Sequence, residues 1–356
     1  MEGLIQISKY AGMRNDLAQA GGGNTSVKLD DQVMLIKSSG CQLADVGRDS
    51  GYIKVDYRLI AAYLEQNVTS DTKDVLTEEE GKRLLVQAQM EEGRASIETF
   101  LHAITGKYTL HSHPMLVNIL VSRKGGMEKL RELFPDAVCV PYQKPGAALA
   151  EACYRACKQQ DLLKEGYEVI FLENHGLVVS ANTAERVIDK TEEILRKIAD
   201  YFHMPYKGQP SATRIWDMLL RIPKLQHMIV YPSQSRYLSW EYIGEMLIAR
   251  GRWNHAFCPD CVVYGAKKML CLCDDFSRRD IVEFMDAHGM PVLICYRRHI
   301  YIMAESVKKA QEIENVMSFA AQVQMANLHE KMNYLSESQQ DELINWDSEK
   351  FRRMMK

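Results

Sequence analysis

The chain has 356 residues, of which 46% are hydrophobic and 26% are charged, so it carries enough apolar material for more than one domain. Lys and Arg (44) nearly balance Asp and Glu (47), and the net charge of −3 does not suggest a nucleic-acid-binding or anionic-membrane surface, so any basic groove would have to be local. No apolar run reaches the roughly 18 residues of a membrane-spanning helix, and the N-terminus lacks a signal-peptide pattern. We expect a cytoplasmic protein that binds neither nucleic acid nor membranes.

The nine cysteines are an odd number spread over a long chain without a secretory signal. A disulfide framework normally shows an even count in a short secreted chain. We therefore expect reduced thiols, as in a cytoplasmic protein.

The first half of the chain alternates predicted helices and strands. Helical spacing of apolar residues predicts a helix over 2–19, which a glycine-rich loop at Gly21–Ser26 ends. A second loop of small residues, Lys37–Gly40, follows a predicted strand. The alternation favours a layered α/β domain. Further elements predicted here are strands at 33–36, 107–113 and 169–172 and helices at 78–90, 115–122 and 183–202.

A break in the pattern divides the chain. Residues 203–211 are rich in proline, glycine and small polar residues, which is typical of a linker. We place one domain at 1–207 and a smaller α/β domain at 208–356. Two helices, over 306–327 and 336–355, are predicted in the second domain.

An internal repeat links the two halves. Residues 166–181 align without gaps with residues 289–304, and a predicted helix follows each segment. His175 then corresponds to Arg298. We interpret the second domain as a degenerate copy without the chemistry of the first, with chance similarity as the alternative.

Three histidines and one glutamate carry the candidate chemistry. His111 and His113 lie two apart on a predicted strand, so their imidazoles share a face and can reach one ion at about 2.0–2.1 Å. His175 follows another strand, beside Gly176. Glu98 precedes His111 by thirteen residues on a probable helix. Taken singly, these residues also fit two unrelated strand histidines, a hydrogen-bonded histidine and a solvated carboxylate.

Six motifs follow one another over residues 1 to about 205. They are Gly22-Gly-Asn24-Thr-Ser26, Lys37-Ser-Ser-Gly40, Ser96-Ile-Glu98 with His102, His111-Ser-His113-Pro114, Pro141-Tyr-x-x-Pro-Gly146 and Glu173-Asn-His-Gly176. Together they resemble the class II aldolase/adducin family, the zinc-dependent sugar-phosphate aldolases related to the fuculose and rhamnulose phosphate enzymes. The resemblance implies a three-layer α/β/α domain.

The resemblance implies a role for each candidate residue. His111, His113 and His175 would bind Zn²⁺ or another divalent transition metal, and Glu98 would be the acid–base carboxylate. The implied reaction is reversible cleavage of a ketose phosphate to dihydroxyacetone phosphate and an aldehyde through a metal-stabilised enediolate.

The loops that hold the substrate phosphate in the family correspond to residues at two places here. They imply phosphate binding by Asn24, Ser38, Ser39 and Gly40, with Ser96 as a further candidate. Lys37 could add charge or be a solvated lysine at a strand end. Ile97 departs from the pattern, since some of these aldolases have a second serine there.

Two other functions are compatible with parts of this pattern. The same metal site could serve a pentulose-phosphate 4-epimerase or a sugar-phosphate dehydratase. An adducin-like interaction module without catalysis is less favoured, because a scaffold has no use for Glu98 beside three histidines. The family also implies a homo-oligomer, commonly a tetramer. The sequence does not specify the sugar.

The second half contains four clustered thiols, at Cys258, Cys261, Cys271 and Cys273. They could hold a structural zinc, but their spacing favours free cysteines in strands. A redox Cys-x-x-Cys normally lies at the start of a helix, which the intervening proline and aspartate do not specify. We interpret Tyr142 as structural, and Trp346 as part of a terminal helix.

Overall fold

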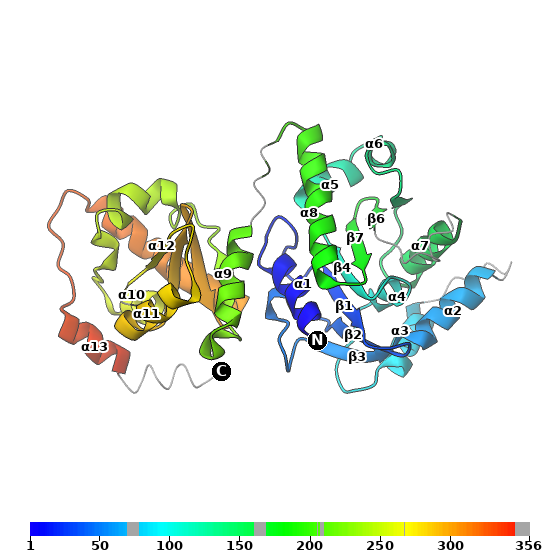
Figure 1. Cartoon of the computed structure of the whole chain (residues 1–356), viewed down its shortest axis with the longest axis horizontal. Coiled ribbons are helices and arrows are strands. Elements are labelled where there is room, and N and C mark those ends of the chain that lie inside the picture. Colours follow the sequence, from blue (N-terminus) through cyan, green and yellow to red (C-terminus); the bar gives the residue numbers. More distant parts are fainter. Residues whose placement is uncertain (70–77, 160–168, 205, 207–209, 267, 346–356) are drawn as a thin grey trace. The chain divides into compact units, whose positions relative to one another are not determined.

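The computed structural model describes residues 1–69, 78–159, 169–204, 206, 210–266 and 268–345. The chain forms two compact units, Met1–Gly208 and Gln209–Lys356 (Figure 1). The dividing point lies within the linker predicted at 203–211. Trp346 and the remainder of the last predicted helix lie outside the described residues.

The first unit is built on a seven-stranded sheet in the order β3-β2-β1-β4-β7-β6-β5. All neighbouring strands are antiparallel except β5 and β6, which are parallel. The strands are β1 (Asn24–Lys28), β2 (Val33–Lys37), β3 (Tyr52–Asp56), β4 (Tyr108–Ser112), β5 (Val138–Val140), β6 (Val169–Leu172) and β7 (Gly176–Ala181).

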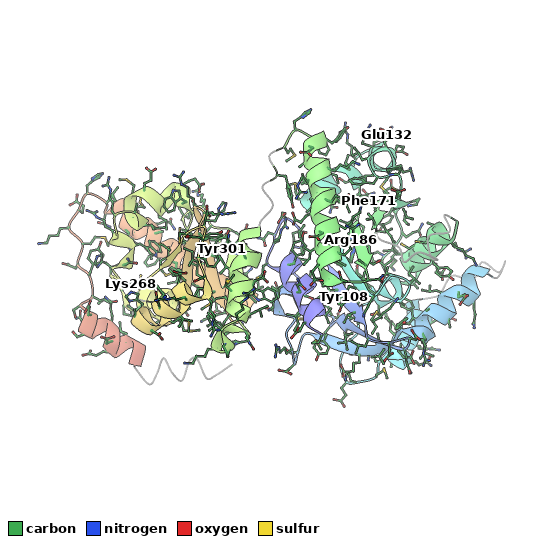
Figure 2. The ribbon with its side chains drawn as sticks, in the orientation of Figure 1. Tyr108, Glu132, Phe171, Arg186, Lys268 and Tyr301 are labelled. Carbon is green, nitrogen blue, oxygen red and sulfur yellow. The ribbon has the colours of Figure 1, made fainter. Side chains whose placement is uncertain are left out.

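Helices cover both faces of this sheet, which explains why β6 is a continuous apolar run. Phe171 of β6 packs into one core with α1, α5, α6 and α8, whereas Ile170 and Leu172 pack into the other with α2, α3, α4 and α7. Figure 2 labels Phe171 and Tyr108, which contribute to the first core. The predicted three-layer α/β/α domain is therefore confirmed. The helices are α1 (Glu2–Gly12), α2 (Tyr57–Thr69), α3 (Glu78–Ala88), α4 (Thr99–Ala103), α5 (Met115–Val121), α6 (Gly126–Leu133), α7 (Ala147–Gln159) and α8 (Ala184–Tyr201).

The segment after α1 differs from the prediction. The first helix ends at Gly12 and not at residue 19. The backbone of Ala44 passes so close to this end that a Cβ on Gly12 would lie 2.0 Å from the Ala44 nitrogen. The predicted loop at Gly21–Ser26 ends at Gly23, and Asn24–Ser26 belong to β1, a buried central strand. The glycines that precede this strand allow the backbone to pass close to His111 and His113.

A buried charge network fixes the turn after α1. Arg14 is 1% exposed, and its guanidinium binds the Asp16 carboxylate, with 2.7 Å between Nη2 and Oδ2. It also pairs with Glu192 of α8 and donates to the Tyr206 hydroxyl at 2.8 Å. The Tyr10 hydroxyl donates to Glu192 at 2.6 Å. The network joins α1, α8 and the chain beyond α8.

The second unit contains a four-stranded sheet in the order β8-β11-β10-β9. β8 and β10 are antiparallel to β11, and β9 is parallel to β10. This is the arrangement of β4-β7-β6-β5 in the first unit. Tyr301, labelled in Figure 2, lies in β11. The strands are β8 (Ile229–Pro232), β9 (Leu270–Leu272), β10 (Leu293–Tyr296) and β11 (His299–Ala304), and the α-helices are α9 (Pro210–Leu220), α10 (Pro259–Gly265), α11 (Arg278–His288), α12 (Val307–Ala326) and α13 (Glu337–Asn345).

The predicted repeat is thus a repeat in structure. Thr183 caps α8, and Ser306 caps α12 at the corresponding position. The turn between the paired strands is one residue shorter in the second copy, since Tyr296 pairs with His299 whereas Leu172 pairs with Gly176. The strand registers place Pro232, Gln234 and Arg298 at the positions of His111, His113 and His175.

The clustered cysteines lie on different elements. Cys258 is the N-cap of α10 and Cys261 lies in its first turn, so placing this pair in a strand was wrong. Cys271 lies in β9, and all nine cysteines are free. Within the described residues, these thiols form no group that could hold a metal ion. No helix in the described part of the chain has the length and apolarity to cross a membrane.

We predict that Arg14→Met lowers the free energy of unfolding of the first unit by about 3–5 kcal/mol, because two carboxylates lose a buried cation. All four tryptophans lie in the second unit, so the measurement is hydrogen exchange of α1 and α8 amides by mass spectrometry. The control is Arg131→Met, which removes an exposed pair with Glu128 and should change stability by less than about 0.5 kcal/mol. Equal effects of the two substitutions would contradict the prediction.

Candidate metal centre

His111 and His113 come from β4, in the middle of the sheet. His111 is fully buried and pairs with Asn24 of β1 on one side and Val178 of β7 on the other. Val178 belongs to the core that contains α4, so the His111 side chain lies on the face that α4 covers. His113 follows the strand by one residue, and alternation returns it to the same face.

His175 comes from the turn between β6 and β7. Asn174 adopts a φ of 51° there, a conformation that asparagine tolerates better than most residues. A Cβ on the next residue, Gly176, would lie 2.4 Å from the Ser112 carbonyl oxygen and 3.0 Å from His113 Cδ2. Glycine at 176 therefore allows the turn to approach the end of β4.

The three imidazoles converge. His111 Nε2 lies 3.2 Å from His175 Nε2 and 3.2 Å from His113 Nε2. Among the described residues, this is the group of histidine, cysteine or acidic side chains that could hold a metal ion. The structure thus brings together the three histidines that the sequence analysis selected.

Glu98 lies against these imidazoles from the N-cap position of α4. Its Oε1 is 3.2 Å from His111 Nε2 and 3.6 Å from His175 Nε2, and its side chain is 15% exposed. The alternative of a solvated helix carboxylate is therefore wrong. Burial raises the pKa of Glu98, but the charge of His111, a hydrogen bond from it and the charges of His102 and His175 outweigh burial and lower it well below its usual range.

The cluster favours neutral imidazoles at two positions. Burial, followed by the charge of His111, lowers the pKa of both His113 and His175 to about 4. Burial also lowers the pKa of His111, but the charge of Glu98, its hydrogen bond and the Leu177 carbonyl raise it above the usual value. The pKa shift of His111 is therefore opposite in direction to those of His113 and His175.

The donor set fits a divalent transition metal. Two nitrogens bound to one tetrahedral ion at about 2.0–2.1 Å lie about 3.3 Å apart, close to the separations found here. His111 Nδ1 lies 3.1 Å from the Leu177 carbonyl oxygen, and donation to it leaves the Nε2 lone pair for a metal. Imidazoles with one carboxylate suit zinc among the available ions.

Glycines leave room for the centre on the side of β1. A Cβ on Gly22 would lie 3.0 Å from His113 Nδ1, and a Cβ on Gly23 would lie 2.9 Å from the His111 carbonyl oxygen. Gly23 also has a φ of 77°, which a side chain would strain. The glycine-rich segment therefore supports the two histidines by close backbone approach.

The segments predicted to bind phosphate meet beside one another. Ser38 forms a bridge with Ala95, and the Ser39 N–H donates to the Arg94 carbonyl at 2.9 Å. The Ser38 N–H donates to the Gly51 carbonyl at 3.0 Å. Both serine N–H groups are thus occupied, which leaves the two hydroxyls to act on a ligand. Gly40 has a φ of 85° and open space around its Cα.

Asn24 and Ser96 are the other two phosphate candidates. Asn24 is 1% exposed, and its Oδ1 accepts from the Thr25 N–H at 2.8 Å. Its Nδ2 is buried and finds no partner among the described residues. The Ser96 hydroxyl oxygen accepts from the Glu98 N–H at 3.3 Å and so helps to shape the turn before α4.

Lys37 is buried and not solvated, which corrects one of the two alternatives from the sequence. It is 3% exposed, and its Nζ donates to the carbonyl of Cys41 at 2.7 Å and, at 3.5 Å, to that of Gly21. Within the described part of the chain, its ammonium pairs with no carboxylate. Burial lowers the pKa of Lys37, and this effect is larger than that of the negative charges of Cys41 and Glu98, which raise it.

Two further residues of the motifs are His102, to which the sequence assigned no role, and Tyr142, which was interpreted as structural. His102 is fully buried one turn after Glu98, and its Nδ1 lies 2.7 Å from the Ser26 hydroxyl. Burial lowers the pKa of His102 to about 3, so its imidazole is neutral at neutral pH. In the sequence, the only indication that His102 belongs to the site was its place in the motif that contains Glu98. Tyr142, interpreted as structural, is 55% exposed, and its N–H donates to the Glu173 carboxylate at 3.0 Å.

Residues 2–199 match the model of the Class II Aldolase and Adducin N-terminal domain, so the chain belongs to this family. It is also similar to an uncharacterized oxidoreductase, YuxG, of Bacillus subtilis (strain 168), with 27% identity over 220 residues. That match covers 57% of this chain and 30% of the relative, so the chain spans less than a third of that protein.

Solved structures are similar to part of the chain. The N-terminal class II aldolase domain of a conserved protein from Thermoplasma acidophilum is 24% identical, with a TM-score of 0.47, and the match covers 56% of this chain and 92% of that one. An L-fuculose-1-phosphate aldolase from Thermus thermophilus is 15% identical, with a TM-score of 0.36, and the match covers 61% of this chain and 94% of that one.

We predict that His113→Ala lowers the affinity for zinc at least about 100-fold, because one of three imidazole ligands is lost. Metal content after dialysis, measured by plasma mass spectrometry, should then fall from about one ion per chain to a trace. His227→Ala, which changes an exposed histidine of the second unit, is the control and should retain the ion. Full metal content in His113→Ala would rule out the centre.

Proposed function

We propose that the chain is a metal-dependent aldolase that reversibly cleaves a ketose phosphate to dihydroxyacetone phosphate and an aldehyde. The family membership supports a lyase of this general kind. The observation that carries the proposal is the approach of Glu98 Oε1, at 3.2 Å, to one of three converging imidazoles. A carboxylate beside three imidazole ligands combines a proton carrier with an open metal site.

We assign the metal to His111, His113 and His175. When bound, a divalent cation would supply the positive charge that stabilises negative charge on the donor as the carbon–carbon bond breaks. The Leu177 carbonyl fixes the tautomer of His111, so that its Nε2 faces the centre.

Glu98 is the group that moves the proton. A glutamate carboxylate is ordinarily ionised at neutral pH, and this one lies 3.2 Å from His111 Nε2. An ionised carboxylate can accept the proton from the donor carbon next to the carbonyl and return it in the reverse direction. The position at the start of a short helix, with the N–H of Glu98 bonded to Ser96, limits its movement.

We propose that the phosphate of the substrate binds beside Lys37, which contacts both the glycine-rich segment and the loop after β2. Its ammonium is buried between the glycine-rich segment and the loop after β2 and lacks a carboxylate partner in the described structure. A desolvated cation attracts an anion more strongly than a solvated one. The Asn24 amide and the hydroxyls of Ser38 and Ser39 would complete the set, with Gly40 and Ser96 shaping the two loops.

We infer that the second unit has no metal chemistry of this kind. Pro232 and Gln234 occupy the positions of the two strand histidines, and Arg298 occupies that of His175. Proline and arginine provide no metal ligand at neutral pH. The unit would then serve packing or substrate access.

A homo-oligomer fits the surface of the first unit. The side chains of Ile97 and Met115 are 49% and 47% exposed, and each lies within two residues of Glu98 or His113. Two such side chains do not by themselves define an interface, so the proposal rests on the family membership. We therefore propose that a second copy of the chain covers this region.

We expect the protein with zinc to exchange the carbon-3 proton of dihydroxyacetone phosphate with heavy water, measured by NMR. Exchange should stop on chelation and return when zinc is restored. Glu98→Gln, which keeps the three imidazoles, should slow exchange at least about 100-fold, because the proton carrier is lost.

The controls separate this activity from a contaminant and from other reactions. A contaminating isomerase that needs no metal would survive chelation, so exchange must follow the metal content. Glu98→Gln must bind zinc as the unmodified protein does. No exchange by a zinc-loaded protein would contradict the aldolase proposal and direct the search to a donor without this phosphate.

We predict that Lys37→Met raises the KM for dihydroxyacetone phosphate about 10–100-fold, since a hydrogen bond to a charged group contributes about 1.5–3 kcal/mol. The KM for unphosphorylated dihydroxyacetone should not change. Lys28→Met is a matched control, because Lys28 is also largely buried and its Nζ donates to the Ala103 carbonyl at 3.0 Å. Equal effects of Lys37→Met on the two donors would place the phosphate elsewhere.

A further inference from the structure

The thiols of Cys258 and Cys261 are in contact, with 3.3 Å between their Sγ atoms. Both cysteines are free. Cys258 is the N-cap of α10 with extended backbone angles, and Cys261 lies three residues later on the same side of the helix. The pair takes no part in the metal centre, which belongs to the first unit.

The two thiols differ in accessibility. Cys258 is half-buried, whereas Cys261 is 5% exposed and lies with Gly265 and Met317 around a small cavity. Burial, followed by the hydrogen bond to Cys258, raises the pKa of Cys261 to about 12. Cys258 is therefore the thiol that a reagent meets first, and Cys261 is the protected thiol behind it.

We propose that Cys258 and Cys261 are a redox-active dithiol that a small-molecule disulfide, such as glutathione disulfide, converts to an intramolecular disulfide. This inference does not depend on the proposed function. An N-cap residue lies outside the regular helix, so Cys258 can adjust its backbone to bring the two sulfurs into bonding distance.

The reaction has two exchange steps. The Cys258 thiolate attacks one sulfur of the small disulfide, the bond between its two sulfurs breaks, and one small thiolate leaves and takes up a proton. Cys261 then loses its proton to solvent and attacks Cys258 Sγ, which releases the second small thiol. Two protein thiols are oxidised, and one disulfide is reduced to two thiols.

A neighbouring pair provides an internal comparison. Cys271 and Cys295 are partners in the parallel strands β9 and β10, and Cys271 is exposed. The flanking pairs Leu270–Ile294 and Leu272–Tyr296 hold both backbones in register. The two thiols are hydrogen-bonded to each other, and partners on neighbouring strands lie about 4.8 Å apart, a separation that a disulfide can span. This second pair can therefore also be oxidised, so the test must distinguish it from Cys258 and Cys261.

The test uses the full chain in buffers of reduced and oxidised glutathione, followed by acid quenching, alkylation of free thiols and peptide mass mapping. In the unmodified protein, Cys258 and Cys261 should lose alkylation together and be joined to each other. Cys261→Ser should stop at the mixed disulfide and carry at least about tenfold more glutathione on Cys258. Cys258→Ser should leave Cys261 alkylated, and Cys271→Ser should still form the bridge.

Circular dichroism checks that each variant folds, and Cys261→Ala replaces Cys261→Ser if the serine is not tolerated. Equal glutathione on Cys258 in the unmodified protein and in Cys261→Ser would overturn the proposal. Full alkylation of Cys258 and Cys261 under conditions that modify Cys271 would also overturn it.

Discussion

The position of β4 between β1 and β7 is the constraint on which the candidate site depends. Antiparallel pairing on both sides fixes which face each residue of β4 presents, so a shift of one residue would move His111 into the opposite core. The same pairing brings the turn of His175 to the end of β4, where only a glycine at 176 leaves enough room. Helices on both faces then bury the cluster, and α4 contributes Glu98 from one of them.

Burial gives this cluster its chemical character. Three imidazoles and a carboxylate in contact are unfavourable without a cation, because desolvation lowers the pKa of two histidines to about 4 and leaves donors such as His175 Nδ1 without a partner among the described residues. A divalent ion would give the converging imidazole nitrogens a common partner. The Asn24 amide nitrogen is also buried without a partner among the described residues. The Lys37 ammonium donates to two carbonyls but has no carboxylate partner there, so both groups can act on an anionic ligand.

Sequence patterns predicted the parts of the site that depend on local periodicity. Alternation on a strand was enough to place His111 and His113 on one face. The ordered motifs implied that His175 and Glu98 belong to the same site. The prediction failed where tertiary contacts decide. Asn24–Ser26 looked like loop because glycines precede them, yet pairing on both sides makes them a central strand. The burial of Lys37 and the end of α1 at Gly12 depend on the loop after β2, which no local pattern positions.

The second unit shows how the fold and the chemistry can separate. Its sheet repeats the order and directions of four strands of the first unit, and Thr183 and Ser306 cap the helix that follows each strand pair. The metal-binding positions are not needed for this sheet, so proline, glutamine and arginine occupy them. The turn also differs in conformation, because Arg297 and Arg298 both adopt positive φ in a two-residue connection. Restoring a histidine at 298 alone would therefore not rebuild the centre, because the longer turn that carries His175 toward β4 is missing.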